Sequence, residues 1–275
     1  MPIATTPDGV RVCWDAIGDP ADPPLLLIQG LGAHLLGWRA EFCRELAAAG
    51  FRVIRFDNRD VGRSQRFPDG GYGIADMAAD AHGLLLALDL APAHVAGQSM
   101  GGAIAQQLAL DHPTAVRSLG LVYTAPSADY LVGRDLVDER MELPRPRTRA
   151  EAGELYLRNE GPCLSPGYPA DLAWLRELGG LMYDRGLDPE GIERQLAAVT
   201  AFGDRMADLH DLAMPTTILH GDGDRLVSTD AATALHEAIP GSRLTVLPGM
   251  GHELPRPLWP QIVAELATNT RREQS

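Results

Sequence analysis

Short apolar runs and amphipathic stretches alternate along most of the chain. The segment Leu25–Gln29 is apolar at nearly every position, which is the pattern of a strand buried on both faces of a parallel sheet. Apolar residues recur at helical spacing over residues 74–90, and another short apolar run follows at 93–96. This alternation predicts the α/β fold class, with a mostly parallel central sheet flanked by helices. We expect strands at 10–16 (as an edge strand), 25–29, 51–57, 93–96, 119–123, 216–221 and 242–247, and helices at 38–49, 74–90, 100–111, 229–239 and 257–267.

The alternation of strand and helix signals stops after about residue 126 and resumes near residue 213. Between these points helical spacing continues without a strand signal, and proline- or glycine-rich stretches interrupt it at 143–147 and 161–167. An insertion of helices between two core strands is typical of a lid over an active site. We therefore expect an α/β core domain formed by residues 1–126 and 213–275, with a helical cap (lid) at 127–212.

A serine flanked by glycines stands where the strand expected at 93–96 meets the following helix. Gly97, Ser99 and Gly101 form a G-x-S-x-G pattern, which is the sequence form of a nucleophile elbow. Small residues are needed on both sides of the serine, because strand and helix approach closely around a tight, strained turn. The pattern also arises by chance in a chain with 29 glycines, so its context decides, and here the context makes Ser99 the candidate nucleophile.

A candidate acid and a candidate base follow Ser99 along the chain. The β-branched and apolar run at 216–221 leads into an acidic turn that contains Asp222 and Asp224. The strand expected at 242–247 leads into a glycine-containing loop that can carry His252 inward. Nucleophile, acid and histidine in this order are typical of hydrolases of the α/β type.

These motifs, together with those at 18–23 and 57–64, resemble the motifs of α/β-hydrolase fold serine esterases. The chain is similar in particular to actinobacterial lipase/carboxylesterases and to the aclacinomycin methylesterase group. The resemblance covers about residues 10–125 and 214–265, and its motifs are specific for fold and catalytic triad but not for substrate. The segment 127–212 matches no family pattern, and such enzymes encode their selectivity there.

The resemblance implies a catalytic triad of Ser99, Asp224 and His252, because the family pattern places the acid at Asp224 and not at Asp222. The implied reaction is cleavage of a carboxylic ester through an acyl-enzyme, with a methyl ester or a lipid-like or polyketide ester as substrate. Cofactor-free C–C hydrolases, perhydrolases and lyases use the same triad, so these reactions remain alternatives. A non-catalytic protein that binds small molecules is a further alternative.

The resemblance also implies an oxyanion hole made by the backbone N–H groups of Leu31 and Met100. Gln29 stands where the family more commonly has histidine, which we expect to change how the loop is braced without removing the donor. His34 has no partner spaced for catalysis, so we expect it at the rim of the site or in contact with substrate. Three apolar residues of the 127–212 segment are expected to line the substrate pocket, with packing in the segment's own core as the alternative: Trp174, Met182 and Phe202.

Charge and residue composition exclude several classes of function. The formal net charge is −13, which argues against nucleic acid as a partner and disfavours anionic membranes. All 24 basic residues are arginine, so Schiff-base chemistry on lysine and a P-loop are excluded. Cys13, Cys43 and Cys163 are widely spaced, which predicts small buried side chains and neither a disulfide framework nor a metal cluster. We expect no metal and no cofactor, a small-molecule ester as partner, and a homodimer as an open possibility.

The length and hydropathy of the chain predict one α/β core domain outside the membrane. At 275 residues and 45% hydrophobic residues the chain can bury a sizeable core. It contains no apolar run of about 18 residues, so we expect no stable membrane insertion. The segment Met1–Thr5 has neither the basic start nor the apolar core of a signal peptide, and we therefore expect a cytoplasmic protein.

Overall fold

The computed structural model describes residues 1–271 and contains one eight-stranded sheet. The strand order is β1-β2-β4-β3-β5-β6-β7-β8, and every pair from β4 to β8 is parallel, whereas β1 and β2 are joined to their neighbours in antiparallel pairs. Parallel neighbours require crossover connections, which explains why helices follow most strands. The strands are β1 Ile3–Thr5, β2 Arg11–Ile17, β3 Pro24–Ile28, β4 Arg52–Phe56, β5 Ala93–Gln98, β6 Val116–Val122, β7 Thr216–Gly221 and β8 Arg243–Leu247.

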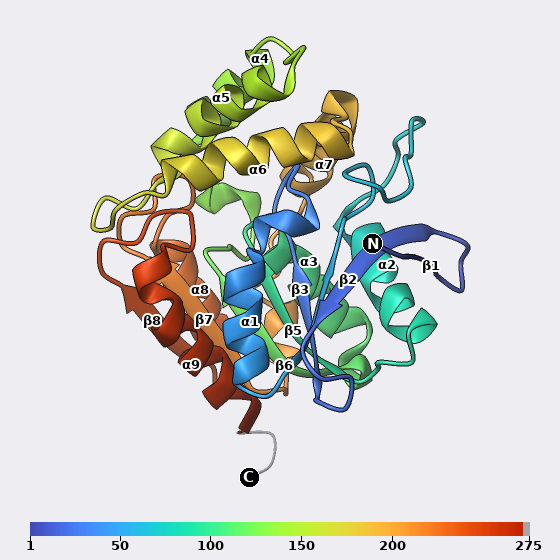
Figure 1. Cartoon of the computed structure of the whole chain (residues 1–275). Helices are drawn as coiled ribbons and strands as arrows, with labels where there is room; N and C mark the ends of the chain where they lie inside the picture. The colour runs from blue at the N-terminus through green and yellow to red at the C-terminus, as the bar shows by residue number, and fades with distance from the viewer. Residues whose placement is uncertain (272–275) are drawn as a thin grey trace.

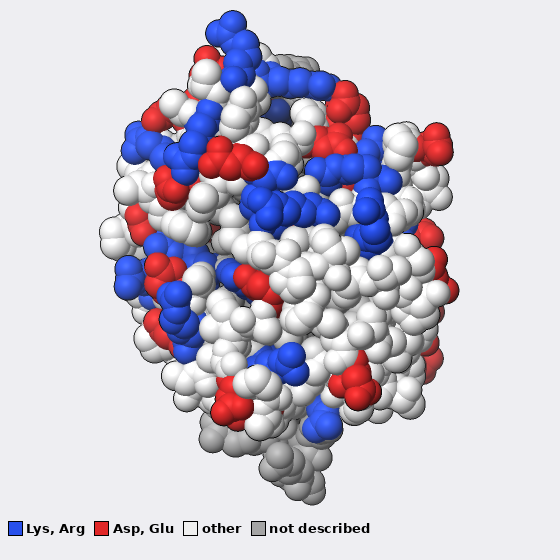
Figure 2. Space-filling view, turned by 45° about the vertical axis from the view of Figure 1, so that its right-hand side comes forward, with Lys and Arg blue, Asp and Glu red and all other residues white. Residues whose placement is uncertain are grey.

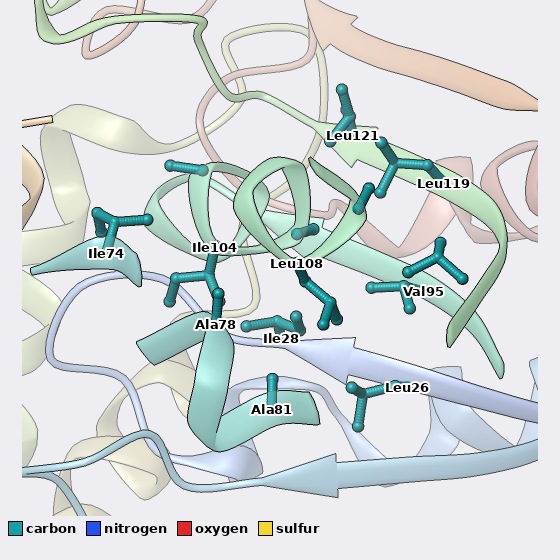
Figure 3. Packing of buried hydrophobic residues seen from close by; sticks show 14 of the residues in the cluster. Leu26, Ile28, Ile74, Ala78, Ala81, Val95, Ile104, Leu108, Leu119 and Leu121 are labelled. Carbon is teal, nitrogen blue, oxygen red and sulfur yellow. The ribbon is translucent and has the colours of Figure 1, made fainter. Parts of the chain in front are cut away.

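Five α-helices cover the two faces of the sheet (Figure 1): α1 Ala40–Ala48, α2 Ile74–Ala87, α3 Met100–Asp111, α8 Asp230–Ala238 and α9 Trp259–Arg271. Leu26 and Ile28 of β3 pack in one core cluster with residues of α2, α3 and α8 (Figure 3). Leu25 and Leu27 of the same strand pack in a second cluster with residues of α1 and α9. Successive side chains of a strand point to opposite faces, so a strand covered on both faces must be apolar throughout.

The segment 127–212 connects β6 to β7 and contains four further α-helices: α4 Arg134–Glu142, α5 Arg149–Glu160, α6 Leu172–Arg185 and α7 Pro189–Thr200. In Figure 1 these helices lie together above the carboxyl-terminal ends of the strands, and none of this segment joins the sheet. The side chains of Thr148, Asp171 and Asp188 cap the first turns of α5, α6 and α7 by accepting hydrogen bonds from backbone N–H groups. Such caps satisfy donors that have no partner within the helix and thus define where each helix begins.

Buried ion pairs join α6 and α7 to the loop that follows β4. Arg185 pairs with Asp57, and their side chains are 7% and 0% exposed. Arg194 binds both carboxylate oxygens of the buried Asp60, with Nε–Oδ2 at 2.8 Å and Nη2–Oδ1 at 3.0 Å. On the face shown in Figure 2, surface arginine side chains also lie beside acidic ones in the upper part of the molecule. If α6 or α7 moved away from the core, a buried aspartate would lose its arginine and its charge would be uncompensated, which is unfavourable. These ion pairs therefore hold both helices on the core.

The structure corrects several expectations about the secondary structure. β6 begins at Val116 and not at residue 119, and α9 continues to Arg271, beyond the expected residue 267. The strand expected at the sheet edge, β2, is flanked on both sides, because β1 pairs with it through Ile3, Ala4 and Thr5. Three residues are too few to show an alternating pattern, which is why the edge strand escaped notice. The helix expected to reach residue 90 ends at Ala87, and Asp89 then has a positive φ of 55°. The six 3-10 helices of the described residues are η1 Leu35–Gly37, η2 Pro113–Ala115, η3 Ala128–Tyr130, η4 Gly161–Cys163, η5 Asp208–Asp211 and η6 Arg256–Leu258.

Candidate active site

Ser99 occupies a strained turn between β5 and α3. Its φ of 54° and ψ of −125° are rare for a residue other than glycine. A Cβ atom at Gly97 would lie 2.0 Å from the carbonyl oxygen of Gly101, and one at Gly101 would lie 2.2 Å from the carbonyl oxygen of Ile28. Only glycine fits at either position, because strand, turn and helix backbones are in contact there. The local sequence therefore builds the turn that presents Ser99.

A cavity of about 570 Å³ lies between the carboxyl ends of the strands and the 127–212 segment. Ser99 and His252 both line this cavity, and Asp224 lies behind His252 with its side chain fully buried. Within residues 1–271 the Ser99 hydroxyl makes no hydrogen bond to the imidazole of His252. Such contacts are often long before a substrate binds and tighten in the complex.

Asp224 accepts hydrogen bonds on both carboxylate oxygens. Oδ2 lies 2.7 Å from Nδ1 of His252 and 3.3 Å from Nε2 of His220. Oδ1 accepts from the backbone N–H groups of Leu226 at 2.8 Å and Val227 at 3.0 Å. Burial alone would raise the pKa of Asp224, but the charge of His252 and these hydrogen bonds hold that pKa well below its ordinary value. Asp224 therefore stays ionised at neutral pH and can accept a hydrogen bond from Nδ1–H, which leaves Nε2 of His252 free to take a proton.

The loop that carries His252 is anchored by the 127–212 segment. The backbone N–H of His252 donates to the carbonyl of Cys163 at 2.8 Å, and that of Gly251 donates to Oγ of Ser165 at 3.0 Å. The N–H of Ser165 in turn donates to Glu253 at 2.8 Å. Three hydrogen bonds on consecutive residues fix the backbone on which the imidazole is mounted.

The backbone N–H groups of Leu31 and Met100 lie beside Ser99 and have no hydrogen-bond partner in the described part of the chain. Both residues line the cavity. Met100 opens α3, so its N–H is one of the donors that a helix leaves unpaired at its N-terminus. A Cβ atom at Gly30 would lie 3.2 Å from Cβ of Ser99, so the loop carrying Leu31 lies directly against the serine. Free donors in this position suit an oxygen that gains negative charge.

Gln29 braces this loop through polar contacts. Its Oε1 accepts from the N–H of Gly30 at 3.1 Å and from Nε2 of Gln98 at 2.5 Å. Oε1 of Gln98 accepts from the hydroxyl of Tyr123 at 2.6 Å. The centroids of the Tyr123 and His252 rings are 4.5 Å apart. One side-chain network therefore connects the loop after β3 with the wall beside the imidazole.

The structure corrects the expectation for His34. Its side chain is buried, is absent from the cavity lining, and accepts a hydrogen bond from Gly62 N–H at 3.1 Å through Nε2. Burial lowers the pKa of His34 to about 4, so the ring is neutral near pH 7. His34 therefore braces the loop after β4, which hides it from a substrate. This placement depends on residues 28 positions away, which no local pattern reveals.

The other residues expected at the substrate pocket do line the cavity. Trp174 and Met182 reach it from α6, and Phe202 reaches it from the segment just after α7. Phe202 also packs in the core cluster that contains α2 and α3, so pocket lining and core packing coincide in one side chain. Asp222, the alternative acid, accepts from the N–H of Gly249 at the surface.

Three residues that contact the site were given no role in it by sequence patterns. His220 stands four residues before Asp224 and contacts its carboxylate. Ser165 supports the His252 loop, and Gln195 of α7 binds Gly32 beside Leu31. The four-residue spacing of His220 was a usable signal. The contacts of Ser165 and Gln195 join segments 86 and 163 residues apart, which periodicity cannot detect.

Within residues 1–271 no group of three or more His, Cys, Asp or Glu side chains is arranged to hold a metal ion. Cys13, Cys43 and Cys163 are buried free thiols. Among the same residues, no helix has both the length and the apolar character needed to cross a membrane.

The chain is similar in sequence and structure to known proteins. Residues 23–154 match the family described as alpha/beta hydrolase fold. The chain is 31% identical over 290 aligned positions to rhodomycin D methylesterase DauP of Streptomyces sp. (strain C5), and 32% identical over 293 positions to rhodomycin D methylesterase DnrP of Streptomyces peucetius, with 97% of each chain covered in both cases. The crystal structure of the esterase RhEst1 from Rhodococcus sp. ECU1013 superposes with a TM-score of 0.81 at 25% identity, covering 98% of both chains.

Proposed function

The chain belongs to the alpha/beta hydrolase fold family, and we propose that it is a serine hydrolase that cleaves carboxylic esters through an acyl-enzyme. The main support is that Ser99, His252 and two unpaired backbone N–H groups line the same cavity. A hydroxyl nucleophile, a base with an orienting carboxylate and two oxyanion donors are the parts that acyl transfer requires.

The proposed first half-reaction forms the acyl-enzyme. Nε2 of His252 takes the proton of the Ser99 hydroxyl while Oγ attacks the carbonyl carbon of the ester. The carbonyl oxygen becomes an oxyanion, which the N–H groups of Leu31 and Met100 stabilise. When this intermediate collapses, the bond to the alkoxy group breaks and the imidazolium returns its proton to the leaving alcohol. Asp224 stays ionised and stabilises the imidazolium throughout.

The proposed second half-reaction consumes one water molecule. His252 removes a proton from water as its oxygen attacks the acyl carbon, and the same two N–H groups stabilise the second oxyanion. Collapse breaks the bond to Oγ of Ser99, which recovers the proton from His252, and releases the carboxylic acid. The balance is one ester and one water converted to one acid and one alcohol.

The proposed substrate is the methyl ester of a large, mostly apolar carboxylic acid. A cavity of about 570 Å³ has the size of sites that enclose a drug-sized ligand. Aromatic and aliphatic side chains from α5, α6 and α7 make up much of its wall. The relatives named above are methylesterases, which supports a small alcohol and a large acyl group in this cavity.

A matched ester panel tests this function. We expect kcat/KM for the methyl ester of a polycyclic aromatic acid to exceed that for methyl acetate by at least about 100-fold, because a large pocket gains about 1 to 3 kcal/mol from each filled contact. Initial rates by chromatography of the released acid measure the ratio. Two further assays test the competing reactions: cleavage of a β-diketone tests C–C hydrolysis, and peracid formation from peroxide tests perhydrolysis. Turnover of the diketone without turnover of any ester would contradict ester hydrolysis and favour C–C cleavage.

We further propose that residues 127–212 act as a cap that sets selectivity. Trp174→Ala or Phe202→Ala should change the relative kcat/KM across an ester-length series by about 5- to 150-fold, because each side chain lines the cavity. Leu172→Ala on the same helix as Trp174 is the matched control, since Leu172 is exposed and does not line the cavity.

Labelling of Ser99 by a small organophosphate measures the chemical apparatus in the same variants. We expect its rate to remain nearly unchanged, because a small reagent does not fill the pocket. Equal losses with every ester and with the small reagent would show that Trp174 and Phe202 support folding or the triad rather than selectivity.

A further inference from the structure

Gln195 of α7 connects the 127–212 segment to two loops of the core. Its side chain is fully buried, its Oε1 accepts from the N–H of Gly32 at 2.9 Å, and its Nε2 donates to the carbonyl of Arg59 at 2.6 Å. Gly32 belongs to the loop after β3 and Arg59 to the loop after β4. Both polar atoms of the amide are thus used, and neither bond is accessible to water.

The bond to Gly32 falls within a tight turn. The N–H of Ala33 donates to the carbonyl of Gly30 at 3.3 Å, and Gly32 has a φ of 67°. This positive φ suits the third position of a type II turn, in which the middle peptide has the opposite orientation to that of a type I turn. The middle peptide here joins Leu31 to Gly32, and glycine allows either orientation. The hydrogen bond to Gln195 selects one of them.

The same turn carries a proposed oxyanion donor. Leu31 lies between Gly30, which packs against Ser99, and Gly32, which is held by Gln195. The side chain of Ile192 also packs on Gly32, where a Cβ atom would lie 3.1 Å from its Cγ1. α7 therefore contacts the turn through one apolar and one polar side chain.

We propose that Gln195 is a positioning residue that fixes the 30–33 turn and with it the N–H of Leu31 in the oxyanion hole. This inference rests on the proposed function. Gln195 does not line the cavity, so it acts on the reaction only through the turn. The cap then contributes to the rate of bond cleavage as well as to selectivity.

The first test replaces Gln195 with leucine, which fills similar space without polar atoms. With p-nitrophenyl butyrate, we expect kcat to fall by about 10- to 100-fold while KM stays within about twofold, because an oxyanion donor acts on the transition state and a small misplacement is costly. The Ki of an alkyl trifluoromethyl ketone, whose hemiketal oxyanion fills the hole, should rise by a similar factor. Gln195→Met provides a second variant if the leucine variant does not fold.

Arg194→Met is the matched control on the same helix. Arg194 anchors α7 to Asp60 but makes no contact with the turn. We expect this variant to lower Tm while kcat, measured well below Tm, stays within about twofold of the parent, since it removes an anchor and no transition-state contact. A merely structural role for Gln195 would give the same pattern as Arg194.

Two results would overturn the proposal and remain distinct from failure of the proposed function. If Gln195→Leu and Gln195→Met lose stability but keep parental kcat and ketone affinity, Gln195 does not position the turn. If they raise KM alone, Gln195 acts on substrate binding. In either case the parent still hydrolyses the ester, whereas a parent with neither ester turnover nor serine labelling would refute the proposed function itself.

Discussion

Replacing Ser99 with alanine should reduce kcat for ester hydrolysis by roughly 10⁵- to 10⁶-fold, the scale seen when a triad nucleophile is removed. The proposed acyl-enzyme requires an oxygen at this position, and the fold supplies no second hydroxyl on the same strained turn. The free energy of unfolding should change little, because the Ser99 hydroxyl makes no hydrogen bond in the described part of the chain. Loss of activity with an unchanged Tm is therefore the expected combination.

Intact-mass spectrometry with a fluorophosphonate probe measures the same assignment directly. The parent should gain the mass of one phosphonyl group, and Ser99→Ala should gain none. Ser127→Ala is the matched control, because Ser127 is a buried serine that also lines the cavity but caps a 3-10 helix through its side chain. Labelling that persists in Ser99→Ala, or that disappears in Ser127→Ala alone, would place the nucleophile elsewhere.

The strained turn at Ser99 could be predicted from sequence because its determinants are local. Gly97 and Gly101 lie within two residues of Ser99, and the backbone contacts that require them are made by the same short segment and β3. The strand covered on both faces could also be predicted from sequence, since burial on two faces leaves no polar position in Leu25–Ile28. Patterns of this kind depend on steric rules that apply within one element.

The supports of the site could not be predicted because they are made between distant segments. Arg185 and Asp57 are separated by 128 residues, and although Asp57 belongs to the motif at 57–64, no local pattern pairs it with Arg185. The surroundings of His34 could not be predicted from its local sequence either. Its loop position suggested substrate contact, but the loop after β4 covers the ring and uses Nε2 as an acceptor. Whether a polar residue faces a cavity or a neighbouring loop is decided by tertiary packing.

The dependence of activity on pH follows from the groups around the imidazole. In the proposed mechanism only a neutral imidazole at His252 can accept the serine proton, so kcat/KM should fall by about tenfold for each pH unit at acidic pH. The lowered pKa of Asp224 keeps this carboxylate charged over the same range, so its protonation does not contribute. Burial lowers the pKa of His34 to about 4, so protonation of that ring does not contribute to the profile above this pH. Initial rates with p-nitrophenyl butyrate in constant-ionic-strength buffers measure the profile.

Replacing His252 with alanine should reduce kcat roughly 10⁵- to 10⁶-fold, about as much as loss of the nucleophile, because the two act as a unit. The acid limb of the pH profile should disappear from the residual activity, since the proposed proton acceptor has been removed. His34→Ala is the matched control: it leaves the buried N–H of Gly62 without its acceptor, which lowers stability by about 1 to 3 kcal/mol. Its kcat, measured below Tm, should remain close to that of the parent. If His252→Ala kept parental turnover while a folded His34→Ala lost it, the base would have to be His34, and the cavity would not be the site of proton transfer.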